Sequence, residues 1–344
     1  MFKRLAHKIA VLIRWFSIWI TRIVRFLTHD LWLLKEEDFS EWKGRLVRDA
    51  KTVVLMVNTF SDQKIGYQIT ALAYRSMLAV VPAIAIGMYL MDGFGLKETF
   101  ADIIYSQFGE AEMTASLLSA ADNIVNTAES GLFGFISMAS FVWIVLSLMF
   151  SIRNVFNNVW KVKRDCKPFR TIGIVIGLMV LSPFVVILFF SGSALYSHAL
   201  AFLFPEQIVF SSHIRSFLTW LVFAGISILV LGIMYKYIPG TRVHSRHAFK
   251  ASVISGVGFT LVQYLYLETQ LMVAKQSAVY GVLAAIPLFM VWLNLGWTIV
   301  LYGAELSYAF QNVDKHQTTV ESLNEMNAEA IRARRERLQN SMNI

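Results

Sequence analysis

The sequence is poor in the residues that build disulfides, metal centres and soluble surfaces. Of its 344 residues one is cysteine, six are proline, and only 16% are charged. The single cysteine, Cys166, excludes an internal disulfide and a cluster of cysteine ligands. The sequence also lacks a glycine-rich phosphate loop with its lysine, a Gly-x-Ser-x-Gly elbow and a Cys/His nucleophile arrangement. These absences argue against ATP-driven transport by this chain alone and leave no candidate catalytic residue.

The histidines provide no metal centre either. His244 and His247 are the only close pair, and the same loop carries Arg242, Arg246 and Lys250. No Asp or Glu lies near them in the sequence, and the surrounding positive charge repels a divalent cation. We therefore predict no metal and no cofactor. The three basic side chains are predicted to bind the phosphate of lipid headgroups instead.

Hydrophobic residues are abundant, at 56% of the chain with a mean hydropathy of +0.55, which is typical of membrane proteins. No charge occurs between Lys275 and Glu305, a run longer than a hydrocarbon core of roughly 30 Å requires at about 1.5 Å per residue. The sequence predicts an all-α polytopic membrane protein with six spans, at about 68–91, 131–152, 171–196, 215–235, 250–267 and 281–304.

The distribution of basic residues predicts the orientation of these spans. Twenty-seven of the 31 Lys and Arg fall in the first 66 residues, in loops 151–170 and 236–250, or after residue 304. Only Lys97 and Lys275 fall in the opposite loops, so both termini are predicted to be cytoplasmic. Topology then explains most of the net charge of +8, and we expect no nucleic-acid partner. The predicted parts are a cytoplasmic or interfacial region 1–66, a membrane domain 67–310 and a polar cytoplasmic tail 311–344, frayed or disordered from Asp314.

The first 30 residues have an amphipathic pattern with their basic side chains within one arc of about 140°. Arg14, Arg22 and Arg25 argue against a span, and we expect them to bind anionic headgroups from a helix lying in the interface. A cytosolic helix packed on the bundle is the alternative. The pattern does not resemble a cleavable signal. A second surface helix is expected to begin near Ser40, with Glu41 in its first turn.

Three stretches together resemble the YihY/BrkB family of bacterial inner-membrane proteins, formerly labelled ribonuclease BN. They are Tyr280-Gly with Ile286-Pro-Leu and the closing Gly303-Ala-Glu-Leu, then Leu72–Pro82, and then Arg153-Asn-Val-Phe-Asn-Asn-Val-Trp160. The resemblance covers about residues 40–310 in order. It implies a multi-pass protein of the inner (cytoplasmic) membrane and no settled chemistry.

Polar residues near the cytoplasmic ends of the spans form the first candidate site. Arg75 lies in the first apolar run, and an arginine there costs roughly 2.5 to 3.5 kcal/mol at mid-bilayer and less near an end. We hypothesise that it pairs with Glu305 or joins a polar cluster with Arg153, Asn154 and Asn157. In the alternative, Arg75 reaches lipid phosphate alone and Glu305 ends a helix.

Prolines within apolar runs form the second candidate feature. Pro82, Pro183 and Pro287 each remove a backbone donor and free a carbonyl one turn earlier. Such kinks shape a cavity if the freed carbonyls face water, and Asn294 is a further polar residue for such a path. Helix packing is the alternative role for the prolines and for Asn294.

Three functions agree with these patterns. The first is a transporter-like protein that translocates or handles lipids or other amphipathic anions, and it predicts a groove reaching past Arg75. The second is a non-catalytic envelope scaffold, which predicts no continuous cavity. The third, a ribonuclease, requires a metal site that the sequence does not offer. Membrane lipids with anionic headgroups are the expected partners, and assembly into a homo-oligomer is left open.

Overall fold

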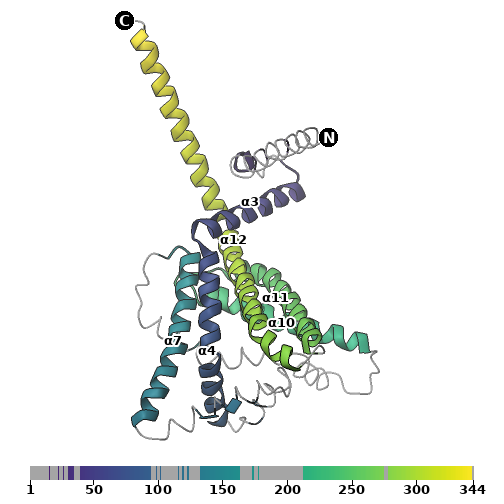
Figure 1. The fold of residues 1–344 in the computed structure, drawn as a ribbon. Helices are drawn as coiled ribbons and strands as arrows, with labels where there is room; N and C mark the ends of the chain where they lie inside the picture. Colours follow the sequence, from purple (N-terminus) through teal and green to yellow (C-terminus); the bar gives the residue numbers. More distant parts are fainter. Residues whose placement is uncertain are drawn as a thin grey trace, which may run out of the picture. The chain divides into compact units, whose positions relative to one another are not determined.

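The structure, a computed structural model, describes residues 30–34, 39–93, 132–162, 212–274 and 278–342, together with isolated positions elsewhere. These residues contain helices and no strand (Figure 1). The helices are α2 (Leu31–Leu33), α3 (Glu41–Asp62), α4 (Ile65–Gly93), α7 (Leu132–Val159), α10 (Ser212–Tyr237), α11 (Ser245–Ala274) and α12 (Ala278–Met342).

Five described helices are long and apolar enough to cross a membrane. Their candidate spans are Ile65–Ala85, Ala139–Val159, Phe217–Tyr237, Ser245–Thr269 and Ile286–Leu323. Each overlaps one of the predicted apolar runs, which confirms the prediction of an all-α protein with several spans. The predicted run 171–196 lies outside the described residues, apart from Gly173 and Gly177.

The chain divides into two compact units, which are described separately. Unit 1 comprises Met1–Thr59 with Tyr308–Ile344, and unit 2 comprises Phe60–Ser307. Most residues before the first candidate span and all residues after the last one therefore belong to the same unit. The three-part division at residues 66 and 310 stays a prediction.

In unit 2, α4 packs against α7 and α10 packs against α11 (Figure 1). The first stretch of α12 joins these helices through two tryptophans. Trp297 donates an indole hydrogen bond to Ser76 of α4 at 3.0 Å, and Trp292 donates one to Gln263 of α11 at 2.9 Å. Because the indole and the amide satisfy each other, these polar groups can be buried inside an apolar bundle.

Small residues allow the helices of unit 2 to approach closely. A Cβ at Gly256 would lie 3.0 Å from the backbone nitrogen of Ile228 on α10. A Cβ at Gly303 of α12 would lie 2.7 Å from the Cβ and Oγ of Ser255 on α11. Helix contacts of this kind are typical of membrane proteins. In lipid the hydrophobic effect does not drive helices together, and van der Waals attraction between close backbones stabilises their association instead.

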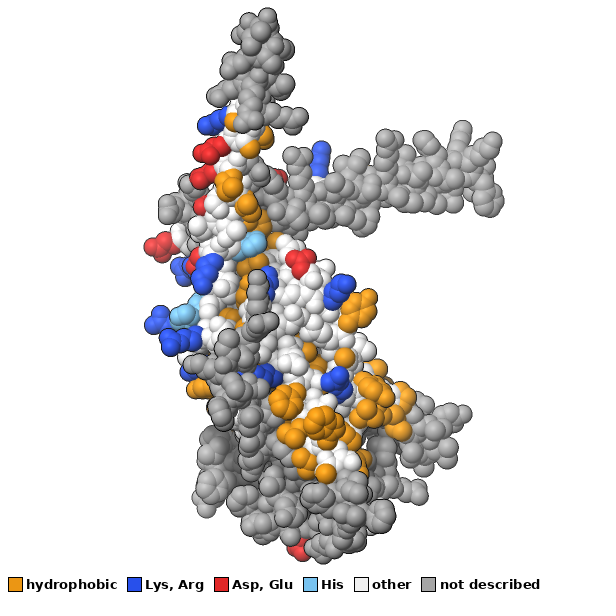
Figure 2. Space-filling view, turned by 90° about the vertical axis from the view of Figure 1, so that its left-hand side faces the viewer, with side chains coloured by type: hydrophobic (Ala, Val, Ile, Leu, Met, Phe, Trp, Pro, Cys, Tyr) orange, Lys and Arg blue, Asp and Glu red, His pale blue; other side chains and the backbone are white. Residues whose placement is uncertain are grey.

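The outer surface of the unit 2 helices carries large hydrophobic side chains. Figure 2 shows hydrophobic side chains gathered on one exposed face, with Lys and Arg side chains also present on that face. The exposed hydrophobic residues come from every candidate span of the unit, among them Leu78, Trp143, Leu229, Leu261 and Val291. A surface of this composition is suited to contact with lipid.

Unit 1 has a small apolar core of its own. Trp32 and Leu55 are buried together with Ala309 and Val313 of α12, and the Trp32 ring lies edge-on to that of His316, with centroids 4.7 Å apart. This core joins residues that are far apart in the sequence.

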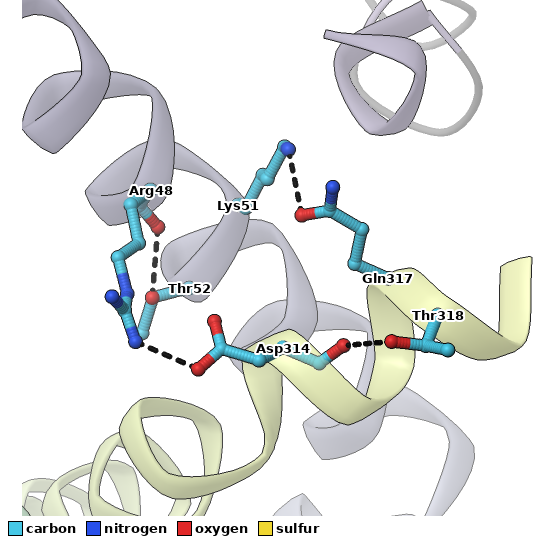
Figure 3. A network of polar contacts seen from close by, with 6 residues as sticks. All are labelled: Arg48, Lys51, Thr52, Asp314, Gln317 and Thr318. Carbon is cyan, nitrogen blue, oxygen red and sulfur yellow. Dashed lines mark hydrogen bonds and ion pairs between the residues drawn. The ribbon is translucent and has the colours of Figure 1, made fainter. Parts of the chain in front are cut away.

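A polar network accompanies this core (Figure 3). Lys51, which is fully buried, donates to the Leu34 carbonyl at 2.6 Å and to Oε1 of Gln317 at 2.9 Å. Arg48 forms an ion pair with Asp314 at 2.8 Å. We call these contacts between α3 and residues 309–320 of α12 the α3–α12 clasp.

The tail was expected to be a frayed helix or disordered from Asp314, and the disordered alternative is wrong for the described residues. α12 continues without a break from Ala278 to Met342. The polar stretch extends a helix that already exists and needs no new nucleus, and the clasp holds its first turns. For the same reason, the alternative in which Glu305 ends a helix is also wrong.

Candidate functional site

An open groove lies between α4 and α7 in unit 2. It has a volume of about 300 Å³. Polar and apolar side chains from both helices line it: Gln68, Ala71, Leu72 and Arg75 on α4, and Ser151, Asn154, Val155 and Asn158 on α7. We call it the α4–α7 groove.

Helical periodicity brings these side chains to one place. The α4 residues recur at intervals of three, one and three, and so do the α7 residues. Such spacing places each set on one face of its helix. The sequence therefore presents two matching polar faces to the space between the helices.

Arg75 supplies the only charge in the lining of the groove. Its side chain is exposed, and one of its guanidinium nitrogens donates a hydrogen bond to Oγ of Ser151. Ser151 in turn donates to the Ser147 carbonyl at 2.7 Å. A guanidinium has five donors, so this contact orients the group and leaves further donors for an anion.

Two asparagines near the end of α7 bind this helix to neighbouring turns of unit 2. Asn158 donates to the carbonyl of Gln63 in the turn between α3 and α4, at 3.5 Å. Asn157 accepts a hydrogen bond from the backbone N–H of Gly240, after α10, at 2.7 Å. These contacts connect the end of α7 to the turn between α3 and α4 and to the turn after α10. They hold the α7 side of the groove in a fixed position.

The end of α7 explains why this side of the groove is rigid. Lys161 has a φ of 53°, and its N–H bonds the Asn158 carbonyl at 2.9 Å. The N–H of Val162 bonds the Asn157 carbonyl, also at 2.9 Å. This is a Schellman motif with lysine in the left-handed position that glycine usually occupies. It satisfies the last carbonyls of α7 and directs the chain away.

The predicted polar cluster is only partly assembled. Arg75 and Asn154 meet in the groove, while Asn157 holds the Gly240 turn. Arg153 is buried and is not among the residues that line the groove. Arg153, Asn154 and Asn157 are close in the sequence but point in different directions from α7. Their closeness in the sequence therefore did not predict a shared cluster.

Glu305 is not brought to Arg75. It is fully buried on α12, and neither carboxylate oxygen has a hydrogen-bond partner among the described residues. Since the hydrogen bond of Arg75 goes to Ser151, the structure does not contain the hypothesised Arg75–Glu305 pair.

The remaining described residues of the predicted path do not line the groove. Pro82 is buried and Pro287 is exposed, each within an uninterrupted helix, and Asn294 is half-buried on α12. None of the three lines the α4–α7 groove. Pro183 lies outside the described residues. A cavity shaped by proline kinks therefore stays a prediction.

The basic surface predicted around α11 is exposed. Arg242, Arg246 and Lys250 all have exposed side chains beside the start of α11, as does Phe249. Within the part of the chain that the structure describes, no group of three His, Cys, Asp or Glu could hold a metal. Arg22 is exposed as well, and Arg14 and Arg25 lie outside the described residues.

The family model for the virulence factor BrkB matches residues 56–328, which is most of the chain. The chain belongs to the BrkB family. The resemblance found in the sequence is thereby confirmed. The match includes α4, α7, α10 and α11 in full and most of α12, so the groove lies inside the family domain.

Several curated proteins are similar to this chain, and they are named UPF0761 membrane proteins. One from Alteromonas mediterranea is 25% identical over 70% of this chain and 82% of its own length. One from Aliivibrio salmonicida is 25% identical over 79% and 83%. One from Legionella pneumophila is 25% identical over 75% of this chain and 61% of its own length. No solved structure matches the chain. The chain is thus an integral membrane protein of this family.

Sequence reasoning missed three polar residues of the groove. Gln68 and Ser151 were not singled out, and Asn158 appeared only within the stretch that carries the family resemblance, although Ser151, Asn154 and Asn158 recur at intervals of three and four. A search for polar residues at helical spacing within the apolar runs would have found this face.

Proposed function

We propose that this membrane protein binds amphipathic anions, above all net-anionic lipids, by their headgroups in the α4–α7 groove and moves them between the leaflets. The observation that carries the proposal is the exposed guanidinium of Arg75 within a groove that also holds amide and hydroxyl groups. A guanidinium binds phosphate through paired hydrogen bonds. The amides of Gln68, Asn154 and Asn158 supply donors for headgroup phosphate oxygens and acceptors for headgroup hydroxyls.

The neighbouring surface suits the acyl chains of such a ligand. Tyr74 and Leu78 are exposed on α4 in the turns around and after Arg75. Phe150 and Trp143 are exposed on α7 in the turns before Ser151. A lipid with its phosphate at Arg75 would find apolar side chains on both helices next to its headgroup.

Charge sets the expected preference among lipids. The groove lining contains one arginine and no acidic side chain. A zwitterionic headgroup would bring an ammonium group that finds no carboxylate in this lining. We therefore expect phosphatidylglycerol to bind more tightly than phosphatidylethanolamine.

The protein is assigned to the inner membrane, with both termini in the cytoplasm, as part of the same proposal. The uneven distribution of Lys and Arg supports this orientation. In this orientation the groove opens toward the cytoplasmic leaflet, whose anionic lipids would be its ligands.

Lipid movement is tested by reconstitution into liposomes that contain fluorescent phosphatidylglycerol. Dithionite added outside bleaches only lipids that reach the outer leaflet. We expect the protein to accelerate complete bleaching, Arg75→Ala to abolish the acceleration, and Arg332→Ala, an exposed tail arginine, to retain it. Equal bleaching with and without protein would refute translocation.

One observation favours the scaffold as the second candidate. The groove lining ends at Arg75 on α4 and at Ser151 on α7, about two helical turns from its other end. A protein that holds lipids without moving them needs no longer groove. This candidate predicts lipid binding that depends on Arg75 together with unchanged bleaching.

A further inference from the structure

Helix α3 of unit 1 carries an apolar stripe that the described core leaves uncovered. Trp42, Leu46, Val53 and Val57 are each between 49% and 61% exposed. At 100° per residue they fall within an arc of about 60°. Four large apolar side chains in one exposed row need an explanation outside the core of the unit.

The opposite face of α3 is already occupied. Gly44, Lys51, Thr52, Leu55 and Thr59 are its buried residues, and they lie within an arc of about 100° opposite the stripe. Leu55 belongs to the core with Ala309 and Val313, and Lys51 forms part of the α3–α12 clasp. The stripe is therefore a second face of the helix.

Charge and chain connectivity indicate what covers the stripe. Lys43 and Arg45 are exposed on its two sides. Asp49, which is also exposed, lies between the stripe and Arg45 and one helical turn after Arg45, so these two opposite charges are neighbours at the edge of the stripe. α3 ends at Asp62, and the first candidate span begins at Ile65. The last turns of α3 are thus tethered to a point where the chain enters the membrane.

We infer that α3 lies in the bilayer interface with the Trp42–Val57 stripe in the boundary between headgroups and acyl chains. Lys43 and Arg45 then lie at the level of the phosphates, and Trp42 occupies the depth that tryptophan prefers. Residues 309–320 of α12 pack on the water side of α3, since the candidate span Ile286–Leu323 has 38 residues and about 20 suffice to cross the bilayer. The inference is independent of the α4–α7 groove.

The test places spin labels on single cysteines in the full-length Cys166→Ser protein, in nanodiscs of phosphatidylcholine and phosphatidylglycerol. Val53→Cys and Val57→Cys report on the stripe. Asn58→Cys, exposed on the polar side of α3, and Thr318→Cys, exposed on the clasped part of α12, are the matched controls. Accessibility to oxygen, which concentrates in lipid, is compared with accessibility to a water-soluble nickel complex.

We expect the ratio of oxygen to nickel accessibility to be several-fold higher at residues 53 and 57 than at 58 and 318. Equal ratios at all four positions would overturn the inference. Low accessibility to both reagents at 53 and 57 would also overturn it, because the stripe would then be covered by protein, such as a second copy of the chain.

A second measurement keeps Cys166 in place, in case its replacement prevents folding. Benzoylphenylalanine is introduced at Val53 or at Asn58 in the otherwise unchanged protein and activated by light. Phospholipid adducts at residue 53 and none at residue 58, seen by mass spectrometry, are the expected result. Protein–protein adducts at residue 53 without lipid adducts would contradict it.

Discussion

Units 1 and 2 join their helices with different polar chemistry. In unit 1 the contacts involve charged groups, with Arg48 on Asp314 and Lys51 on Gln317. In unit 2 neutral pairs connect α10, α11 and α12, such as Tyr235 with Ser255 at 2.8 Å and Trp292 with Gln263, and the charged Arg75 that bonds Ser151 lies in the open α4–α7 groove. The difference follows from the solvent expected around each unit, since a charge is costly in lipid and cheap at a water interface.

The units differ in packing as well. Unit 2 relies on glycines at close helix approaches, whereas unit 1 encloses a small core under a tryptophan. A methyl group added at a close helix approach should therefore lower the stability of unit 2. Removal of a charged side chain from the clasp should lower the stability of unit 1.

The largest effect is expected for Gly256→Ala in unit 2. The new Cβ would lie 3.0 Å from the nitrogen and 3.1 Å from the Cα of Ile228, and a helix backbone cannot move aside alone. We expect a loss of about 1–3 kcal/mol of stability, typical of overpacking, seen as a lower melting temperature in detergent.

Gly225→Ala is the matched control for this substitution. No atom lies within 4 Å of a Cβ added at Gly225, and alanine favours a helix over glycine by up to about 1 kcal/mol. Its melting temperature should be equal or higher. Equal losses for the two variants would show that close helix approach does not distinguish unit 2.

Lys51→Met in unit 1 is expected to have the next largest effect. It removes the donor to the Leu34 carbonyl and to Gln317, and a buried acceptor left unsatisfied costs about 1–3 kcal/mol. Faster hydrogen exchange of amides in residues 309–320 would show the loss. Lys43→Met, at an exposed position of the same helix, should leave that exchange unchanged.

The Arg48–Asp314 pair should contribute least. Its side chains are 43% and 67% exposed, and exposed pairs contribute about 0–1 kcal/mol. Asp314→Arg should speed exchange in the clasp slightly, and added Arg48→Asp should restore it. A recovery that persists in high salt would contradict an electrostatic origin.

Hydropathy alone located much of this fold. The predicted run 215–235 corresponds to the candidate span Phe217–Tyr237, and the predicted start of a helix after Ser40 agrees with α3 beginning at Glu41. Spans are predictable because twenty apolar residues in a row have few alternatives. The start of a helix is predictable because its first turn has local preferences.

The candidate site was harder to predict, for a reason that Arg75 and Glu305 illustrate. Both were expected near the cytoplasmic ends of their spans, but a position along a span does not fix the direction in which a side chain points. Arg75 faces the groove and Ser151, whereas Glu305 is buried on α12. The clasp escaped prediction as well, because Arg48 and Asp314 are joined only by tertiary packing across most of the chain.

The most direct test of the proposed function is native mass spectrometry of the protein with equal amounts of phosphatidylglycerol and phosphatidylethanolamine. It is measured for the wild type, Arg75→Gln and the surface control Arg332→Gln. The wild type and the control should retain phosphatidylglycerol preferentially, and Arg75→Gln should lose that preference while remaining folded. An unchanged preference in Arg75→Gln would contradict the assignment of the α4–α7 groove as the headgroup site.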